Sequence, residues 1–414
     1  MDAYDCYLNE LVNLNKSVYS KYSNIKWVNA YNSSEYQNIR EQLLDKTGNS
    51  VLFNNTKPYL NHLSKGCNLC GKGLWSCLFI TGKCNANCFY CPTSQIIDDV
   101  SGSQGLTFPT AESYAEYVNF FKFKGVSFSG GEPLLVADRV LNYLEQIRKT
   151  CSPDIYTWMY TNGILANDKI FNKLAEHGLN EVRFDIGATA YNLDKIKFAK
   201  GIIPNISIEI PAVPEEKERL KELLPEMVKA GVSNLNLHQL RLTEYNAEKL
   251  LKHNYTFIPA EKPIVLESEL AALEIIEYAR EQKIDIGINY CSFFFKNRFQ
   301  QVGFRKIVAN AISNNGTIIN NKGFIRAVNE NKIRYYSTRI ADEGKLSVPF
   351  ETLQLKNKTY CWKNELVHNQ IISDNGQLRK TINLINKEPD NIPDDEDLFE
   401  IWRLEYIEKG LREY

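Results

Sequence analysis

Residues 66–92 read GCNLCGKGLWSCLFITGKCNANCFYCP, and six of the ten cysteines of this 414-residue chain fall within that stretch. Its second half places Cys84, Cys88 and Cys91 in the spacing C-x3-C-x2-C, directly after an apolar run at 77–80 that is typical of a buried strand. Three thiolates on one tight loop can bind three irons of a 4Fe-4S cube and leave the fourth iron open to another ligand. The stretch therefore predicts a cluster with an open coordination position.

This spacing, with the aromatic residue Tyr90 before the last cysteine, resembles the signature of the radical S-adenosylmethionine (SAM) superfamily. The resemblance implies that SAM chelates the open iron through its amino and carboxyl groups. It also implies that an electron from the cluster cleaves SAM to a 5′-deoxyadenosyl radical. An electron-transfer protein would normally supply a fourth cysteine, because a closed ligand shell protects the cluster. For the three cysteines alone, a chance spacing or a zinc loop is the alternative.

The composition limits the compartment and the partners of the protein. The chain carries 49 basic and 50 acidic residues, evenly interspersed, which argues against binding to duplex nucleic acid or to an anionic membrane. No apolar run reaches the length of a membrane span, and the polar stretch at residues 1–5 is unlike the start of a signal peptide. We therefore expect a cytoplasmic protein, in which clustered cysteines bind metal or take part in catalysis.

From Leu74 onward, short apolar runs alternate with amphipathic stretches, which indicates repeated βα units around a parallel sheet. Six strands are predicted, and a helix at 267–282 followed by a strand at 284–290 forms a possible seventh unit. The six strands are expected at 77–80, 126–129, 155–160, 181–186, 206–210 and 235–238. The predicted fold class is α/β, a partial (βα)6 barrel of the kind that the superfamily resemblance implies.

Three parts are expected along the chain. Residues 1–65 form an N-terminal cap with a helix near 34–44, and residues 66–300 form the barrel with its upstream cysteine loop. Residues 301–414 form a small α+β domain, with a hairpin from strands at 323–328 and 333–340 and a last helix at 397–410. This domain either recognises the substrate, for example a peptide laid along a strand edge, or acts as a structural cap.

Polar motifs follow the second and third predicted strands. In parallel barrels the catalytic and binding residues lie at these strand ends. The second strand ends in Ser129-Gly130-Gly131-Glu132, which matches the G-G-E motif of the superfamily. The resemblance implies that the backbone of this motif binds the SAM amino group, with Glu132 as a nearby anionic partner. After the third strand, Thr161-Asn162-Gly163 is similar to the T-N-G motif, whose polar side chains reach SAM.

Later strand ends supply further candidates. By the resemblance, Asp185 binds the ribose or the carboxylate of SAM; the alternative is a solvated residue at a strand end. Glu209 lies in the strand that aligns with the stretch packing on the adenine, and the period of two does not tell whether its side chain points into the barrel. His238 ends the sixth strand and is a candidate catalytic residue on the substrate side, with a purely structural role as the alternative.

A second metal site is predicted upstream of the cluster loop. Cys67 and Cys70 form a C-x2-C half-site, and Cys77 follows six residues later. Such a half-site suits iron, zinc or an auxiliary iron-sulfur cluster, because its two thiolates converge. Cys361 is the favoured fourth ligand and Cys291 the alternative. Cys291 is also a catalytic candidate, since a thiol at the end of the seventh strand can quench or relay a substrate radical.

Together the motifs predict an enzyme that cleaves SAM at a 4Fe-4S cluster and abstracts hydrogen from a peptide, a protein or a small molecule. A reductant such as flavodoxin or ferredoxin would supply the electron. The alternative is a non-catalytic electron-transfer or cluster-carrier protein. A carrier has no need of six βα units with G-G-E and T-N-G at strand ends. A zinc-stabilised nucleic-acid-binding module, the remaining class, lacks the expected basic charge.

Overall fold

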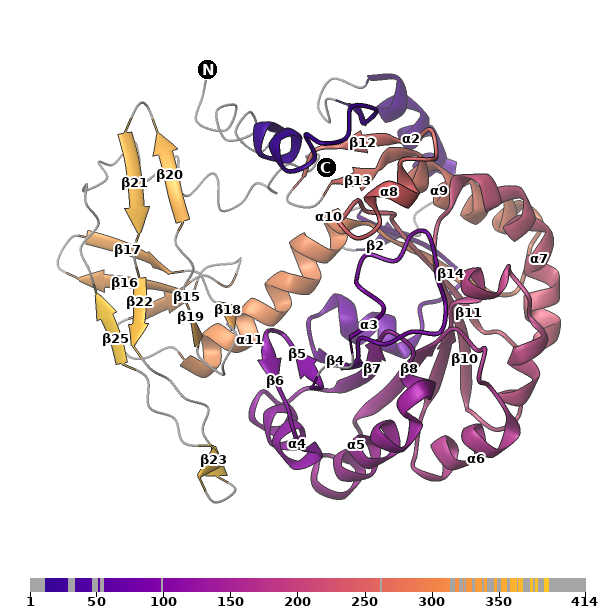
Figure 1. The fold of residues 1–414 in the computed structure, drawn as a ribbon, viewed down its shortest axis with the longest axis horizontal. Coiled ribbons are helices and arrows are strands. Elements are labelled where there is room, and N and C mark those ends of the chain that lie inside the picture. The colour runs from indigo at the N-terminus through magenta and orange to yellow at the C-terminus, as the bar shows by residue number, and fades with distance from the viewer. Residues whose placement is uncertain are drawn as a thin grey trace.

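The computed structural model describes residues 12–28, 34–46, 51–52, 56–97, 100–260 and 263–312, and beyond them Gly323 and short strands between 317 and 386. Its centre is an eleven-stranded sheet in the order β2-β3-β14-β11-β10-β9-β8-β7-β4-β5-β6. The seven consecutive strands β14-β11-β10-β9-β8-β7-β4 of this order run parallel to one another. Figure 1 shows this sheet curved into an open barrel with helices along its outer face.

The parallel strands confirm the six predicted ones and add the seventh. They are β4 (Trp75–Thr81), β7 (Gly125–Gly130), β8 (Tyr156–Thr161), β9 (Glu181–Phe184), β10 (Asn205–Pro211), β11 (Asn234–His238) and β14 (Gly287–Cys291). Antiparallel strands extend both edges: β2 (Val51–Leu52) and β3 (Lys57–Leu60) beside β14, and β5 (Gly102–Ser103) and β6 (Leu106–Thr107) beside β4. The possible seventh unit is confirmed, because β14 pairs in parallel with β11 along its whole length.

Amphipathic helices cover the outside of the sheet, as the apolar periodicity predicted. They are α4 (Ala111–Phe120), α5 (Ala137–Thr150), α6 (Asp168–Glu176), α7 (Lys217–Ala230) and α9 (Leu266–Glu281). In α7 the side chains of Leu220, Leu224 and Met227 are buried, and Gly231 ends the helix in a left-handed conformation (φ 91°). This packing follows from the 3.6-residue period, which places those residues on one face.

The inner face of the sheet is polar. Along β9, Val182 and Phe184 belong to the apolar core under the helices, whereas Glu181 and Arg183 alternate with them and are also buried. The short helix α3 (Lys65–Gly71) lies against this inner face. A Cβ atom added at Gly66 would come within 2.2 Å of Arg183 Nη2. The interior of the barrel is therefore filled by a helix and by buried polar side chains.

Segments before and after the barrel pack on its rim. The helix α2 (Ser34–Lys46), predicted at 34–44, joins α9 through an ion pair of 2.9 Å between Arg40 and Glu269. A small sheet combines β1 (Lys26–Trp27) with β12 (Thr256–Ile258) and β13 (Ile264–Val265). Since β3 is part of the barrel sheet, the first part of the chain contributes directly to the barrel. The division into three domains stays a prediction.

The chain leaves the barrel through α10 (Phe293–Phe295), η5 (Lys296–Gln301) and α11 (Val302–Ile312), and Figure 1 shows α11 leading towards the late strands. The predicted hairpin is confirmed by the antiparallel pairing of β16 (Ile325–Asn329) with β17 (Lys332–Tyr336). The predicted helix at 397–410 lies outside the described residues. Within the described part of the chain, no helix combines the length and apolar character needed to cross a bilayer.

Candidate active site

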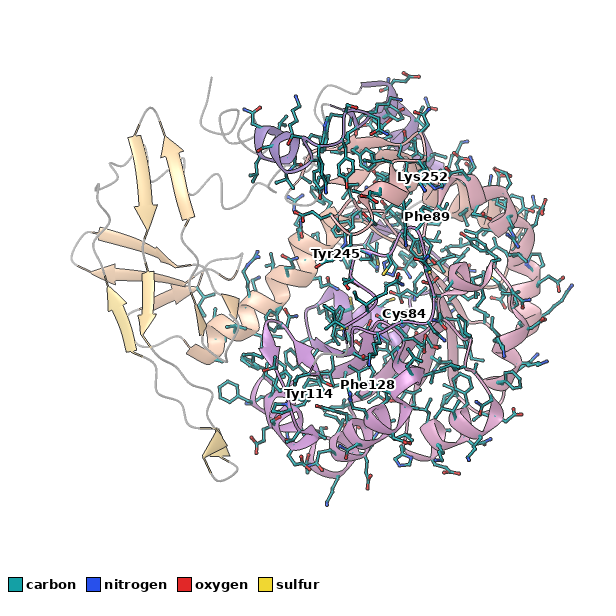
Figure 2. All side chains as sticks on the ribbon, in the orientation of Figure 1. Cys84, Phe89, Tyr114, Phe128, Tyr245 and Lys252 are labelled. Atoms are coloured by element: carbon teal, nitrogen blue, oxygen red, sulfur yellow. The ribbon has the colours of Figure 1, made fainter. Side chains whose placement is uncertain are left out.

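Cys84, Cys88 and Cys91 lie on the loop that follows β4, at the edge where the parallel strands end, and Figure 2 shows Cys84 at the centre of the curved sheet. Burial and the charge of Asp185 raise the pKa of Cys88 to about 12, and the other two thiols add to this, so all three are near neighbours. Among the described residues, no three His, Cys, Asp or Glu side chains are placed to hold a metal ion. A single ion needs all its thiolates within about 2.3 Å of one point, whereas each cysteine of a cube binds its own iron. Three cysteines on one loop fit a 4Fe-4S cluster, in which each would bind a separate iron.

The G-G-E turn anchors the chain that leads to Cys84. The backbone N–H of Gly131 donates to the carbonyl of Thr81 over 2.7 Å, and that of Glu132 donates to the carbonyl of Lys83 over 2.7 Å. A Cβ atom at Gly131 would lie 1.9 Å from the Lys83 carbonyl oxygen, and one at Gly130, where φ is +126°, would lie 2.2 Å from that of Thr81. Both glycines are required here because two backbone segments touch.

Gly131→Ala is expected to lower the free energy of unfolding by about 2 kcal/mol or more, because the added methyl group must displace backbone rather than a side chain. Urea denaturation of the two proteins measures the change. The matched control is Gly201→Ala, where φ is +77° but no atom lies within 4 Å. That control is expected to cost only about 1–2 kcal/mol for its backbone conformation. Equal stability of Gly131→Ala and wild type would contradict the close approach.

The carboxylate of Glu132 joins the G-G-E turn to the T-N-G turn. It is fully buried and accepts hydrogen bonds from Leu134 N (2.9 Å), Thr161 Oγ1 (2.7 Å) and Asn162 N (2.6 Å). Asn162 in turn places its Nδ2 3.7 Å from Cys84 Sγ. Both oxygens of Glu132 are thus engaged by the protein. The geometry supports a role for Glu132 in positioning Asn162 beside the cluster loop.

Glu132→Gln is expected to destabilise the protein by about 1–3 kcal/mol at neutral pH, because one of the buried N–H or O–H donors then faces an amide NH2 group. Burial raises the pKa of Glu132 above the ordinary 4.5. The carboxyl group of Glu132 therefore binds its proton more tightly in the folded state than in the unfolded state. As a result, the free energy of unfolding of wild type falls as the pH rises from 4.5 through the raised pKa. The advantage of wild type over Glu132→Gln should be larger at pH 5 than at pH 8 in urea denaturation. A stability difference between the two proteins that does not change with pH would contradict this prediction.

Asp185 and Tyr90 form one unit at the end of β9. The Tyr90 hydroxyl donates to Asp185 Oδ1 over 2.8 Å, and Gly187 N donates to the same oxygen over 3.1 Å. Burial raises the pKa of Asp185 to about 6. The carbonyl of Tyr90 accepts from Asn246 Nδ2 over 3.1 Å. Asp185 is therefore a half-buried, hydrogen-bonded residue that ties the cluster loop to the end of β9.

Glu209 points into the barrel, which settles the alternative that periodicity left open. Its carboxylate pairs with Arg183 Nη1 at 2.5 Å and with His238 Nε2 at 2.6 Å. Arg183 also pairs with Glu181 at 2.8 Å. Burial alone would raise the pKa of Glu209, but the charge of Arg183 and the hydrogen bonds from Arg183 and His238 hold it well below its ordinary range. Burial and the nearby Lys296 lower the pKa of His238, which favours a neutral imidazole backed by a carboxylate.

The upstream cysteines separate into two places. Cys67 lies 3.4 Å from Asn236 Oδ1, and Cys70 accepts from Gln300 Nε2 over 2.6 Å. Cys291 accepts from Lys57 Nζ over 2.7 Å. Burial alone would lower the pKa of Lys57, but the charges of Cys291, Cys67 and Cys70 and the hydrogen bond to Cys291 more than offset this and raise it.

Cys77 is placed elsewhere, since its thiol bonds with Ser127 and Ser129 on the neighbouring strand. Ser129, expected near SAM, therefore contacts Cys77 inside the barrel. Cys361 belongs to β21 (Lys358–Trp362), whose side chains are outside the described part of the chain.

Sequence reasoning missed Lys57. A lysine inside the short strand KPYL was the available signal.

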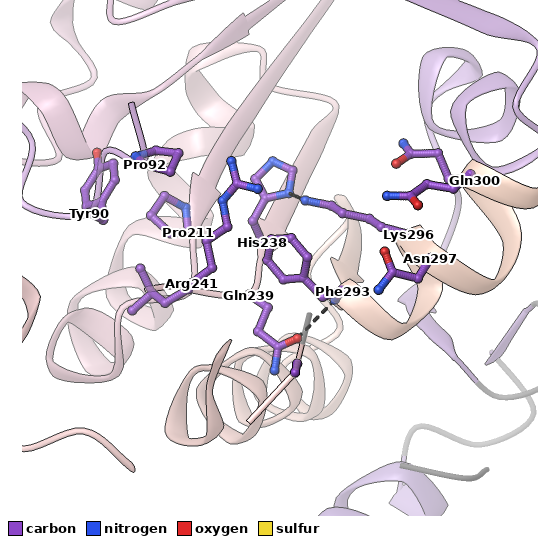
Figure 3. Close-up of a pocket in the computed structure, with 13 residues that line it drawn as sticks. Tyr90, Pro92, Pro211, His238, Gln239, Arg241, Phe293, Lys296, Asn297 and Gln300 are labelled. Carbon is purple, nitrogen blue, oxygen red and sulfur yellow. Dashed lines mark hydrogen bonds between the residues drawn. The ribbon is translucent and has the colours of Figure 1, made fainter. Parts of the chain in front are cut away.

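A pocket of 380 Å³ opens beside the cluster loop (Figure 3). Tyr90 and Pro92 from that loop line it, together with His238, Arg241 and Lys296. Figure 3 also shows the hydrogen bond of 3.0 Å that the N–H of Phe293 donates to Gln239 Oε1. The structure thus places His238, expected on the substrate side, in the lining of this pocket. It adds Arg241 and Phe293, which sequence reasoning missed.

Residues 78–203 match the family model described as the radical SAM superfamily. The chain contains a radical SAM domain. This match covers the cluster loop and the G-G-E and T-N-G turns, whose contacts with one another are described above. The radical SAM domain is thus that of an enzyme superfamily, and its motifs lie at the strand ends where the sequence predicted them.

Relatives of the radical SAM domain carry two different functional names. The chain is 31% identical over 251 residues to "Putative glycyl-radical enzyme activating enzyme" of Methanocaldococcus jannaschii, covering 58% of this chain and 65% of that protein. It is 26% identical over 186 residues to "GTP 3′,8-cyclase" of Clostridium perfringens, covering 42% and 56%. The chain spans less than two thirds of the length of either relative. Among solved structures, SuiB of Streptococcus suis bound to its precursor peptide SuiA matches with a TM-score of 0.40 and 14% identity, over 53% of this chain and 48% of that one.

Proposed function

We propose that this chain is an enzyme that reductively cleaves SAM at a 4Fe-4S cluster held by Cys84, Cys88 and Cys91. One observation carries the proposal: the cluster loop, the G-G-E turn and the T-N-G turn meet at one edge of the parallel sheet, with Asn162 Nδ2 3.7 Å from Cys84 Sγ. When bound, the cluster and SAM would supply a 5′-deoxyadenosyl radical that abstracts hydrogen from the substrate.

The residues of the chain hold and orient these groups. The SAM amino group is a donor, so it would bind carbonyl oxygens of the turn at 130–131, whose neighbouring N–H groups already bond to the cluster loop. Asn162, Thr161 and the Tyr90–Asp185 pair are the candidates for the SAM carboxylate and ribose. His238, backed by Glu209, would face the substrate as a proton acceptor or donor. The closed interior would keep water from the radical.

The substrate class follows from the relatives only as a proposal. The name of the Methanocaldococcus relative supports a peptide or protein substrate, and the name of the Clostridium relative supports a small molecule. Flavodoxin or ferredoxin is the proposed reductant. Residues 301–414 are the proposed recognition domain.

We also propose a second iron, zinc or auxiliary cluster site on Cys67 and Cys70. Cys291 acts electrostatically on Cys67 and Cys70, whereas Cys77 bonds with Ser127 and Ser129; this favours Cys291 over Cys77 as a further ligand, and Cys361 stays a candidate. Metal analysis with Mössbauer spectroscopy, on a variant lacking Cys84, Cys88 and Cys91, isolates this site. Folded but metal-free protein would refute it. If Cys291 binds no metal, its thiol remains the candidate radical relay.

The decisive experiment is anaerobic incubation of the reconstituted protein with SAM and dithionite. We expect 5′-deoxyadenosine above a no-enzyme control, and deuterium in that product when deuterated peptides or metabolites of the cell extract are supplied. Protein that holds a full cluster but forms no deoxyadenosine would support the electron-transfer or carrier alternative instead.

A further inference from the structure

Two cations, Arg241 and Lys296, face the pocket of Figure 3, and no carboxylate of the described residues lines it. Arg241 follows β11 and Lys296 begins η5, and both lie beside the ring of Phe293, at 5.4 Å and 4.9 Å from its centroid. Among the described residues that line the pocket there is no Asp or Glu. Within the described ranges, neither cation forms an ion pair. The pocket therefore carries two positive charges in close proximity.

Such an arrangement costs free energy unless an anion binds. Burial lowers the pKa of both groups, and for Lys296 the charge of Arg241 lowers it further, whereas Cys291, Glu209 and Cys70 raise it and Cys91 raises that of Arg241. Glu209, a carboxylate whose charge acts on Lys296, is already paired with Arg183 and His238. Lys296 Nζ lies only 3.4 Å from His238 Nδ1, a contact that supplies no negative charge. An anion between the two cations would offset both their mutual repulsion and their desolvation.

The rest of the lining suits an organic anion. Tyr90, Phe293 and two prolines provide apolar surface, and Asn297 and Gln300 provide amide groups that can donate hydrogen bonds. A guanidinium group binds carboxylate or phosphate oxygens through two parallel bonds. The volume of 380 Å³ is within the range of small-molecule sites. Because Tyr90 and Pro92 flank Cys91, a group held here lies next to the cluster loop.

We infer that Arg241 and Lys296 bind a carboxylate or phosphate group of the substrate and so fix the reacting part of the molecule beside the cluster loop. This inference rests on the proposed function, since it takes the pocket as the substrate site. It names the recognised chemistry: a small organic anion, or a peptide that offers an acidic or phosphorylated group.

Calorimetric titration of the cluster-loaded protein, saturated with SAM, tests the inference with two probes, inorganic pyrophosphate and citrate. We expect wild type to bind at least one of them. Arg241→Gln and Lys296→Gln should each weaken that binding about ten- to hundredfold, because each removes a charge-assisted hydrogen bond. Arg241→Lys keeps the charge and should keep most of the affinity. Tighter binding of pyrophosphate supports a phosphate group, and tighter binding of citrate supports a carboxylate.

Arg219→Gln and Lys229→Gln are the matched controls, since both cations lie outside the pocket and pair with glutamates on or next to α7. They should leave anion binding unchanged. The inference is overturned if wild type binds neither probe, or if the pocket variants bind both as wild type does. It is also overturned if Arg241→Gln weakens only the binding of SAM. Deoxyadenosine formed without substrate is measured in parallel, so that a failure of SAM cleavage is distinguished from a failure of anion binding.

Discussion

Replacing Cys84, Cys88 and Cys91 together with alanine is expected to reduce 5′-deoxyadenosine formation to the no-enzyme background and to remove one 4Fe-4S cluster per chain. The loop offers no other cysteine to replace them, and a thiolate is needed for each of three irons. Since enzymes typically accelerate their reactions by about 10⁶-fold or more, loss of the cluster should leave no measurable turnover. Chromatography of the products, with iron and sulfide analysis, measures both effects.

Cys151→Ala is the matched control for that variant. Its thiol is half-buried, contacts the carbonyl of Ala115 at 3.6 Å and lies outside both cysteine groups. It should keep the cluster and the activity of wild type. The assignment of the cluster to the C-x3-C-x2-C loop would be wrong if the triple variant, with Cys67 and Cys70 also removed, kept the same iron content and electronic spectrum.

Arg183→Met is expected to lower the free energy of unfolding by about 3–5 kcal/mol, the largest stability effect of any single substitution considered for this chain. The guanidinium is almost completely buried and pairs with Glu181 and Glu209. Methionine fills a similar length but leaves two buried carboxylates without a counter-charge. Urea denaturation of both proteins measures the loss.

Two comparisons make this result specific to the buried charges. Arg219→Met, at a half-exposed arginine with a 3.5 Å pair to Glu216, should cost about 1 kcal/mol or less. Adding Glu181→Gln and Glu209→Gln to Arg183→Met should recover part of the stability, because it removes the uncompensated charges. If neutralising both glutamates gives no recovery, the loss in Arg183→Met comes from packing instead.

The strands of the barrel were predictable because each combines an apolar run with a polar motif at its end. β7, for example, runs directly into the G-G-E turn, and β8 into T-N-G. The inner face was not predictable in the same way. A period of two separates the two faces of β10 but does not say which one faces the helices, so the side of Glu209 needed its partners Arg183 and His238.

The candidate site was predictable only where it is local in sequence. The cluster loop and its spacing are contained in a few residues, whereas the pocket combines Arg241 with Lys296, which come from separate elements. The same limit applies to the proposed second metal site on Cys67, Cys70 and Cys291. Cys67 lies near Cys291 only because α3 folds back onto the inner face of the sheet, while Cys77 is directed by β4 towards Ser127. Contacts between residues that are far apart in the sequence produce no periodic pattern from which they could be predicted.

The position of α3 decides the route by which a substrate can travel. This helix sits at the beginning of the strands, where a Cβ atom at Gly125, the first residue of β7, would come within 3.1 Å of Leu69. Helix α3 therefore fills the end of the barrel where the parallel strands begin, opposite the strand ends that carry the cluster loop. A substrate of the proposed enzyme would then approach from the strand ends, where the pocket of Figure 3 opens beside the cluster loop.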